Sequence, residues 1–170
     1  MARLFLAIWP GDAASASLAQ LAQDVALVAQ GKPVERAKIH LTLVFLGEVA
    51  RERQEAIAQV ARASARRKRF TLVLDRVGSF RRSRVAWAGA SVEPPGLMDL
   101  QSRLEGGLRA AGFTPEERPY RPHVTLARKV AQALPMAAIE PVHIACAAIA
   151  LVLSEPGTGR YATLESWALD

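Results

Sequence analysis

Cysteine is almost missing from this sequence. Cys146 is the only one among 170 residues, so no disulfide can form within the chain, which fits a reducing cytoplasm. Apolar runs are short, and none reaches the roughly 20 residues that cross a bilayer. The apolar start at residues 4–9 is too short for the core of a signal peptide and ends at Pro10-Gly11. We therefore expect a cytoplasmic protein that does not bind a membrane.

The sequence patterns of several enzyme classes are missing too. No strand runs into a glycine-rich phosphate loop, which disfavours a doubly wound nucleotide-binding fold. No Gly-x-Ser-x-Gly elbow is present, which disfavours a serine hydrolase. Cys146 lies in the apolar run 144–153, where we expect a buried thiol and not a nucleophile.

Two of the three histidines stand in a repeated tetrapeptide, His-Leu-Thr-Leu at 40–43 and His-Val-Thr-Leu at 123–126. Apolar and β-branched neighbours predict a strand at each copy. Because side chains alternate along a strand, His and Thr face one way while the aliphatic residues face a core. A single His-x-Thr is more often structural. Two copies in one chain favour a pair of imidazoles that act together as acid and base.

Such a pair suits transfer of a phosphoryl group. One imidazole takes a proton from the nucleophile and the other gives one to the leaving group, while Thr42, Thr125 and nearby arginines hold the phosphate oxygens. Neither tetrapeptide contains Asp or Glu, threonine is a poor metal ligand, and His143 is the only further histidine. We therefore expect no metal and no cofactor.

Apolar periodicity predicts an α+β fold with mostly antiparallel strands. We expect strands at 3–9, 40–46, 70–77, 85–90, around His123, 142–153 and 161–169, helices at 14–29, 51–67 and 97–111, and loops at 34–38, 115–122 and 134–141. A helix precedes each His strand, and the two motifs are about half the chain apart. The expectation is one domain over residues 1–170, made of two pseudo-symmetric lobes. Each lobe pairs a His strand with a helix on the outside, and a cleft lies between the lobes.

Positive charge favours an anionic partner. The net charge is +6 and the isoelectric point is about 10.2, which suits RNA, a nucleotide or a phosphate ester. The basic runs 66–69 and 81–84 either guide an RNA backbone or are simply solvated. The run 81–84 is slightly the better candidate for RNA contact, because the strand that follows it resembles a strand of a known enzyme family. No protein partner is implied.

Further segments resemble one enzyme family in order and spacing. They are Arg-Leu-Phe-Leu-Ala-Ile at 3–8, His-Leu-Thr-Leu-Val-Phe-Leu-Gly at 40–47, Ser-Arg-Val-Ala-Trp at 83–87, Pro-Pro-Gly-Leu at 94–97, Arg-Pro-Tyr-Arg-Pro at 118–122, His-Val-Thr-Leu-Ala-Arg at 123–128, and the closing Arg160-Tyr161 and Trp167. Over essentially the whole chain this set is similar to the bacterial RNA 2′,3′-cyclic phosphodiesterases of the two-histidine phosphoesterase superfamily. These enzymes were first described as 2′-5′ RNA ligases.

The resemblance implies a bilobal α+β fold and hydrolysis of a terminal 2′,3′-cyclic phosphate to a 2′-phosphate. It also implies reversible joining of such an end to a 5′-hydroxyl. His40 would donate a proton to the departing 3′ oxygen, and His123 would accept one from water. Thr42 and Thr125 would bind the phosphate oxygens. The residues alone do not say which histidine has which role, because the two motifs are nearly alike.

Two further site candidates follow the tetrapeptides. Arg128, which the family shares, would hold the phosphate or the terminal nucleotide, or else is a solvated arginine at a strand end. Strict alternation turns it away from the cleft, and a bulge at the strand end would bring it back. Phe45 either stacks on a nucleobase or packs in the core, and alternation favours the core.

Two other functions stay open from the sequence. The same fold could act on another cyclic or 2′-linked nucleotide, such as an ADP-ribose cyclic phosphate or 2′-5′ oligoadenylate. The chain could also be a basic RNA-binding module without catalysis.

Overall fold

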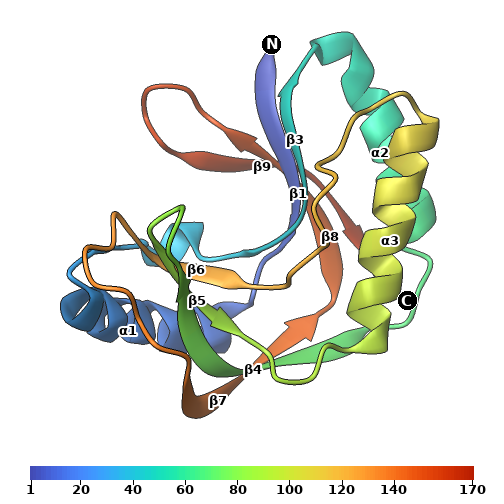
Figure 1. Cartoon of the computed structure of the whole chain (residues 1–170). Helices are drawn as coiled ribbons and strands as arrows, with labels where there is room; N and C mark the ends of the chain where they lie inside the picture. The colour runs from blue at the N-terminus through green and yellow to red at the C-terminus, as the bar shows by residue number, and fades with distance from the viewer.

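The computed structural model describes residues 1–170, with three α-helices, two short 3₁₀ helices and nine strands (Figure 1). The helices are α1 Asp12–Ala29, η1 Arg36–Lys38, η2 Arg51–Arg53, α2 Gln54–Ser64 and α3 Pro95–Ala110. The strands are β1 Ala2–Ile8, β2 Lys32–Pro33, β3 Leu41–Val49, β4 Phe70–Phe80, β5 Val85–Gly89, β6 Val124–Arg128, β7 Ala137–Cys146, β8 Ala148–Ser154 and β9 Tyr161–Ala168. The predicted α+β class is confirmed. No helix is both long and apolar enough to span a bilayer.

The strands form one antiparallel sheet in which the two motif strands are neighbours. Its order is β7-β4-β5-β6-β3-β1-β8-β9, and the short β2 pairs with β6. β3 and β6 meet at a single residue pair, Leu41 with Val124. Because the strands run in opposite directions, this pair places His40 beside Thr125 and Thr42 beside His123. All four polar side chains therefore gather around one point at the centre of the sheet.

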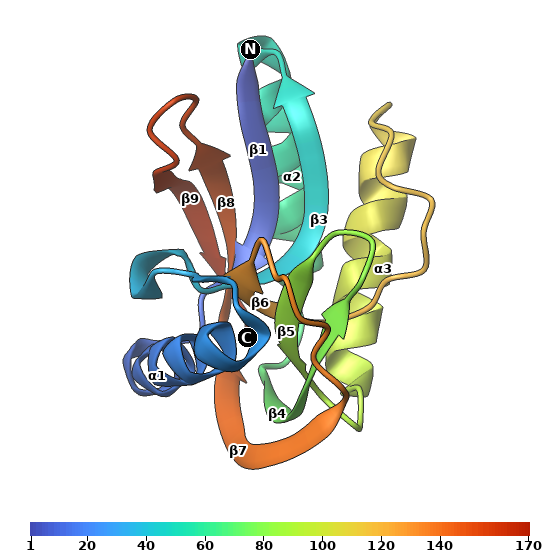
Figure 2. The ribbon, with the colours of Figure 1, turned by 60° about the vertical axis from the view of Figure 1, so that its left-hand side comes forward.

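α1 and α3 are crossed helices: each packs against the half of the sheet that does not contain the strand preceding it in the sequence (Figures 1 and 2). α1 follows β1 in sequence but packs against β6 and β7. α3 precedes β6 but packs against α2 and β3. The expectation that each His strand pairs with a helix is met, yet the partner is not the helix that precedes it. The pseudo-symmetry of two lobes stays a prediction. The strand order is compatible with it.

Regular apolar spacing explains why α1 and α3 pack where they do. Buried residues recur every three or four positions in both helices, so each presents one apolar stripe to the sheet. These residues are Ala14, Leu18, Ala22, Val25, Ala26 and Ala29 in α1, and Leu97, Leu100, Leu104 and Leu108 in α3.

The segment expected as one strand at 142–153 is two strands in different halves of the sheet. β7 pairs with β4 at one edge, and after Ala147 the chain continues as β8 beside β1. β7 also takes in part of the loop expected at 134–141. The expected loop ended at Pro141, but β7 is an edge strand whose pairing with β4 is irregular around this residue, and proline is tolerated at edges and bulges.

Other boundaries differ by a few residues. The first strand of the expected hairpin at 70–90 extends to Phe80, and the helix expected at 51–67 begins as η2 and ends at Ser64. The loop expected at 34–38 contains η1. Cys146 is fully buried as predicted, and burial raises the pKa of its thiol to about 12.

Candidate active site

The two tetrapeptides line one cleft of about 920 Å³. Each histidine lies immediately before its strand and is partly buried. All six residues that the sequence singled out line this cleft: His40, Thr42, Phe45, His123, Thr125 and Arg128. Residues that are far apart in the sequence therefore meet at the centre of the sheet.

Both imidazoles are anchored in the same way. Nδ1 of His40 donates to the carbonyl of Lys38 at 2.6 Å, and Nδ1 of His123 donates to the carbonyl of Arg121 at 2.8 Å. A carbonyl oxygen can only accept, so the ring proton sits on Nδ1 in each neutral histidine. In both motifs the anchor is the carbonyl two residues earlier. This leaves Nε2 of each ring available to exchange a proton in the cleft.

The surroundings of His40 are aromatic. Its ring centroid lies 4.9 Å from that of Phe5, 5.5 Å from Tyr161 and 5.8 Å from Trp9. Nε2 of His40 is 2.9 Å from Oγ1 of Thr42, whose hydroxyl can donate to the neutral ring. Burial among these groups lowers the pKa of His40, while the Lys38 carbonyl opposes the shift and the positive charges of Arg128 and His123 add to it.

The surroundings of His123 are more open. The edge of one aromatic ring, Phe80, lies 5.1 Å away by centroids, and no hydroxyl bonds to Nε2 of this histidine. Burial lowers the pKa of His123 as well, the Arg121 carbonyl opposes the shift, and the positive charge of Arg128 adds to it. Both rings are therefore held toward the neutral form in the free protein.

A bulge in each motif strand turns a further side chain into the cleft. Consecutive residues of β1 pair with Thr42 and Val44, so Leu43 is an extra residue in β3. Consecutive residues of β5 pair with Thr125 and Ala127, so Leu126 is an extra residue in β6. Each bulge shifts the alternation by one position. The residue five positions after each histidine then joins the His and Thr face.

These residues are Phe45 and Arg128. Phe45 is 41% exposed and lines the cleft, so the expectation that it packs in the core is wrong. The Arg3 guanidinium lies 5.3 Å from the centroid of its ring. Arg128 is exposed and lines the cleft, as expected if the strand bulged. Strict alternation failed at both positions for the same physical reason.

Tyr120 is a site residue that the sequence reasoning missed. Its hydroxyl donates to the backbone carbonyl of Thr42 at 2.8 Å and so ties the loop before β6 to β3. Burial raises the pKa of this phenol, which therefore stays protonated and can donate. The only sequence signal was its place between Pro119 and Arg121 in a segment that resembles the family.

The two basic runs have different environments. Arg82 lines the cleft, and Arg84 donates to the carbonyls of Lys129 and Val130. In the run 66–69, Arg67 pairs with a carboxylate on α3, and none of the four residues lines the cleft. Only the run 81–84 reaches the site.

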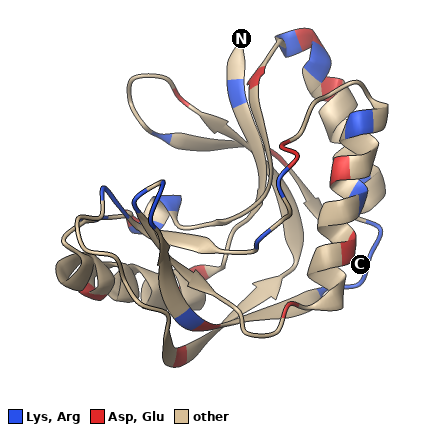
Figure 3. Ribbon diagram, in the orientation of Figure 1, with Lys and Arg blue, Asp and Glu red and all other residues tan.

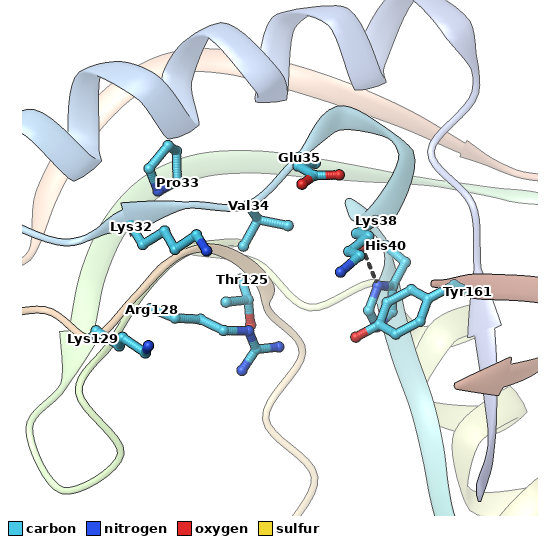
Figure 4. A pocket seen from close by; sticks show the side chains of 10 residues that line it. All are labelled: Lys32, Pro33, Val34, Glu35, Lys38, His40, Thr125, Arg128, Lys129 and Tyr161. Atoms are coloured by element: carbon cyan, nitrogen blue, oxygen red, sulfur yellow. Dashed lines mark hydrogen bonds between the residues drawn. The ribbon is translucent and has the colours of Figure 1, made fainter. Parts of the chain in front are cut away.

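A smaller cavity of about 230 Å³ adjoins the same centre (Figure 4). It shares His40, Thr125 and Arg128 with the larger cleft, and Tyr161 forms one side. Lysine and arginine gather where β2, the β4–β5 turn and the end of β6 meet (Figure 3). No three His, Cys, Asp or Glu side chains are grouped so as to hold a metal ion.

A family model described as the 2′-5′ RNA ligase superfamily matches residues 10–156. The chain belongs to this superfamily. The superfamily assignment agrees with the resemblance noted in the sequence, which is thereby confirmed.

Similar proteins support the assignment in sequence and in structure. The RNA 2′,3′-cyclic phosphodiesterase of Escherichia coli K12 is 37% identical over 145 residues, which cover 82% of this chain and 80% of the relative. The enzyme of the same name from Aeropyrum pernix is 39% identical over 61% of each chain.

Among solved structures, E. coli LigT complexed with 3′-AMP superposes with a TM-score of 0.90 at 33% identity, over 99% of this chain and 98% of that one. TT0787 of Thermus thermophilus has a TM-score of 0.84 at 30% identity, over 98% and 97%.

Proposed function

We propose that this protein hydrolyses RNA ends that carry a 2′,3′-cyclic phosphate, giving a 2′-phosphate, with His40 and His123 as the acid and base. One observation carries the proposal. In both rings Nδ1 donates to a backbone carbonyl, which leaves Nε2 to exchange a proton in the same cleft. The names of the similar proteins in E. coli and A. pernix point to the same reaction.

The proposed step is a displacement at phosphorus. Nε2 of His123 accepts a proton from water as the water oxygen attacks the phosphorus. The bond from phosphorus to the 3′ oxygen breaks, and Nε2–H of His40 gives its proton to that oxygen. One P–O bond forms and one breaks, and one proton passes from His40 to the product while another passes from water to His123. Proton exchange with solvent then resets the pair.

His40 must be protonated to act as the acid, although burial favours its neutral form in the free protein. A bound phosphate places a negative charge beside the ring, which raises the pKa of His40 when substrate is present. The Lys38 carbonyl that accepts from Nδ1 stabilises the imidazolium in the same way. Binding of the substrate therefore favours the protonated form of His40 that acts as the acid.

Threonine and arginine would bind the charge that develops on the phosphate. The Thr42 hydroxyl lies 2.9 Å from Nε2 of His40 and Thr125 lines the same cleft, so both hydroxyls would donate to the non-bridging oxygens. Arg128 is shared by both cavities and would form charge-assisted hydrogen bonds to the same group. Phe45, which lines the cleft, would stack on the terminal base. With a 5′-hydroxyl in place of water as the nucleophile, the same displacement would join two ends through a 2′-5′ bond, again with the 3′ oxygen as the leaving group, and its reverse would cleave that bond.

The test is an RNA with a 2′,3′-cyclic phosphate end, incubated with the protein in the presence of EDTA. We expect a 2′-phosphate product. His40→Ala and His123→Ala should each lower kcat by roughly 100- to 10,000-fold, the usual contribution of a general acid or base. His143→Ala is the matched control, because this third histidine is exposed on β7 outside the cleft.

Three results would count against the proposal. A 3′-phosphate product would mean that the 2′ oxygen leaves. Loss of activity in EDTA would mean that a metal takes part. Full activity of both site variants, with RNA binding retained, would leave only a basic RNA-binding module.

A further inference from the structure

The smaller cavity is rich in positive charge that no ion pair within the protein neutralises. Lys32, Lys38, Arg128 and Lys129 line it, and Glu35 is its only acidic lining residue. None of these five side chains takes part in any of the ion pairs of the structure. The proposed reaction uses Arg128 and leaves the lysines without a role.

The backbone forces three of these cations together. Lys32 lies directly opposite Arg128 in the β2–β6 pairing, so both side chains leave the sheet on the same face. Like charges placed opposite each other destabilise a sheet. Figure 4 shows Lys32, Arg128 and Lys129 extending into the same space. Their mutual repulsion is relieved when an anion lies between them.

An uncommon backbone conformation brings Lys129 into this group. Consecutive residues of a strand point to opposite faces, so Arg128 and Lys129 would be separated in an extended chain. Lys129 instead has φ of 54°, in the left-handed region that residues other than glycine rarely adopt. Such conformations persist where the surrounding structure enforces them, often at functional sites.

Arg84 enforces the turn at Lys129. Its guanidinium donates to the carbonyls of Lys129 and Val130, at 3.4 and 3.1 Å, and its own carbonyl accepts from the amide of Val130 at 3.0 Å. The backbone of Arg84 is also in the left-handed region, with φ of 55°. Two strained residues and three hydrogen bonds thus hold one lysine in the cavity.

We propose that the smaller cavity is a second phosphate site, which holds the phosphate on the 5′ side of the terminal ribose while the cyclic phosphate lies at His40 and His123. The inference rests on the function proposed above. In an RNA that ends in a cyclic phosphate, the nearest other anion is the phosphate attached to the 5′ carbon of the same ribose. Because the two cavities share Thr125 and Arg128, adjacent phosphates can occupy them together. Phosphate contacts of this kind position a nucleic acid without reading its sequence.

The experiment compares two substrates that differ by one group: a nucleoside 2′,3′-cyclic phosphate with and without a 5′-phosphate. The wild-type protein should have a kcat/KM about 10- to 100-fold higher on the 5′-phosphorylated substrate, the range expected for hydrogen bonds to a charged group. In the double variant Lys32→Gln/Lys129→Asn, the ratio of the two kcat/KM values should fall toward one. Asn is chosen at position 129 because it tolerates the left-handed conformation. Lys68→Gln, an exposed lysine of the run 66–69, should keep the wild-type ratio.

Two results would overturn the second phosphate site. One is a wild-type ratio near one, and the other is a double variant that keeps the wild-type ratio. If neither substrate is hydrolysed, the proposed function fails, and calorimetry still tests the site with a nucleoside 2′,5′-bisphosphate and the 2′-monophosphate. Tighter binding of the bisphosphate that is lost in the double variant supports the site, and equal binding of the two nucleotides overturns it.

Discussion

His40 and His123 share an anchor and differ in their neighbours. Both rings donate from Nδ1 to a carbonyl two residues earlier, which fixes the tautomer in the same way. His40 lies among three aromatic rings and beside a threonine hydroxyl, whereas His123 has one aromatic edge. A nearly symmetric pair thus acquires two unequal environments, as an acid and a base require.

The lowered pKa values predict an acidic optimum for kcat/KM. In the free enzyme His123 must be neutral and His40 protonated, and the pKa of each lies below the usual 6.5. Activity should therefore fall on the acid side as His123 gains a proton and on the basic side as His40 loses one, with both limbs below 6.5. The basic limb of kcat should lie at higher pH, because bound phosphate raises the pKa of His40. Initial rates across this range test it, and a kcat/KM that keeps rising above 6.5 would contradict it.

Tyr120→Phe should weaken both stability and catalysis. The change removes the donor to the carbonyl of Thr42 and should lower the free energy of unfolding by about 0.5–1.5 kcal/mol. The kcat should fall because Thr42 is less firmly placed. Urea unfolding and steady-state rates measure the two effects. Tyr161→Phe is the control for stability, because the Tyr161 hydroxyl makes no hydrogen bond within the protein; an equal loss in both variants would refute the role of Tyr120.

At the scale of elements, the two bulges limit what the sequence could predict. The tetrapeptides, the strands that carry them and the convergence of His and Thr follow from local pattern. Phe45 was misplaced because alternation was extended through Leu43, and only the pairing with β1 reveals that residue as extra. Arg128 is oriented by the matching bulge at Leu126. A bulge depends on the partner strand, which local sequence does not specify.

The break at Ala147 was missed for a related reason. An apolar run from 142 to 153 is consistent with one buried strand, and nothing local marks the change of partner from β4 to β1. The crossed packing of α1 and α3 could not be predicted from the sequence either. An apolar stripe indicates that one face of a helix is buried, but it does not indicate which strand covers that face.

Two adjacent glycines of α3 test the packing of the helices. Gly107 faces Val60 of α2, and a Cβ at this position would lie 2.7 Å from Cγ1 of that valine. Gly107→Ala should destabilise the protein by about 1–3 kcal/mol, as overpacking does. Gly106→Ala meets no atom within 4 Å and should stabilise by about 0.5–1 kcal/mol through helix propensity. Thermal unfolding measures both, and a shift of the same sign in the two variants would contradict the packing.

At the scale of the whole molecule, the crossed helices tie the two halves of the sheet together. β3 and β6 share one residue pair, so the sheet alone gives the halves a narrow connection. α1 spans from β1 to the β6 side, and α3 joins the β3 side by packing on β3 and α2. Helix packing therefore adds to this single residue pair in holding the two motif strands together.

This arrangement predicts that both halves unfold together. Trp9 lies beside His40, and Trp87 packs near Phe80 in the half that carries His123. In each variant that keeps only Trp9 or only Trp87 as a tryptophan, the urea midpoint by fluorescence should equal the midpoint by circular dichroism of that same variant, as two-state unfolding requires. A fluorescence midpoint that departs from the circular-dichroism midpoint would mean that the halves are independent units.

The position of Tyr161 on the last strand has a consequence for biosynthesis. β8 pairs with β1, and β9 brings this ring against the side of His40, so residues made last complete the surroundings of a histidine made early. Until β9 has been made and paired, this imidazole lacks one of the three aromatic rings that surround it. The full burial of the acid therefore depends on a strand made long after it, and a chain shortened before Tyr161 should have a smaller lowering of the His40 pKa.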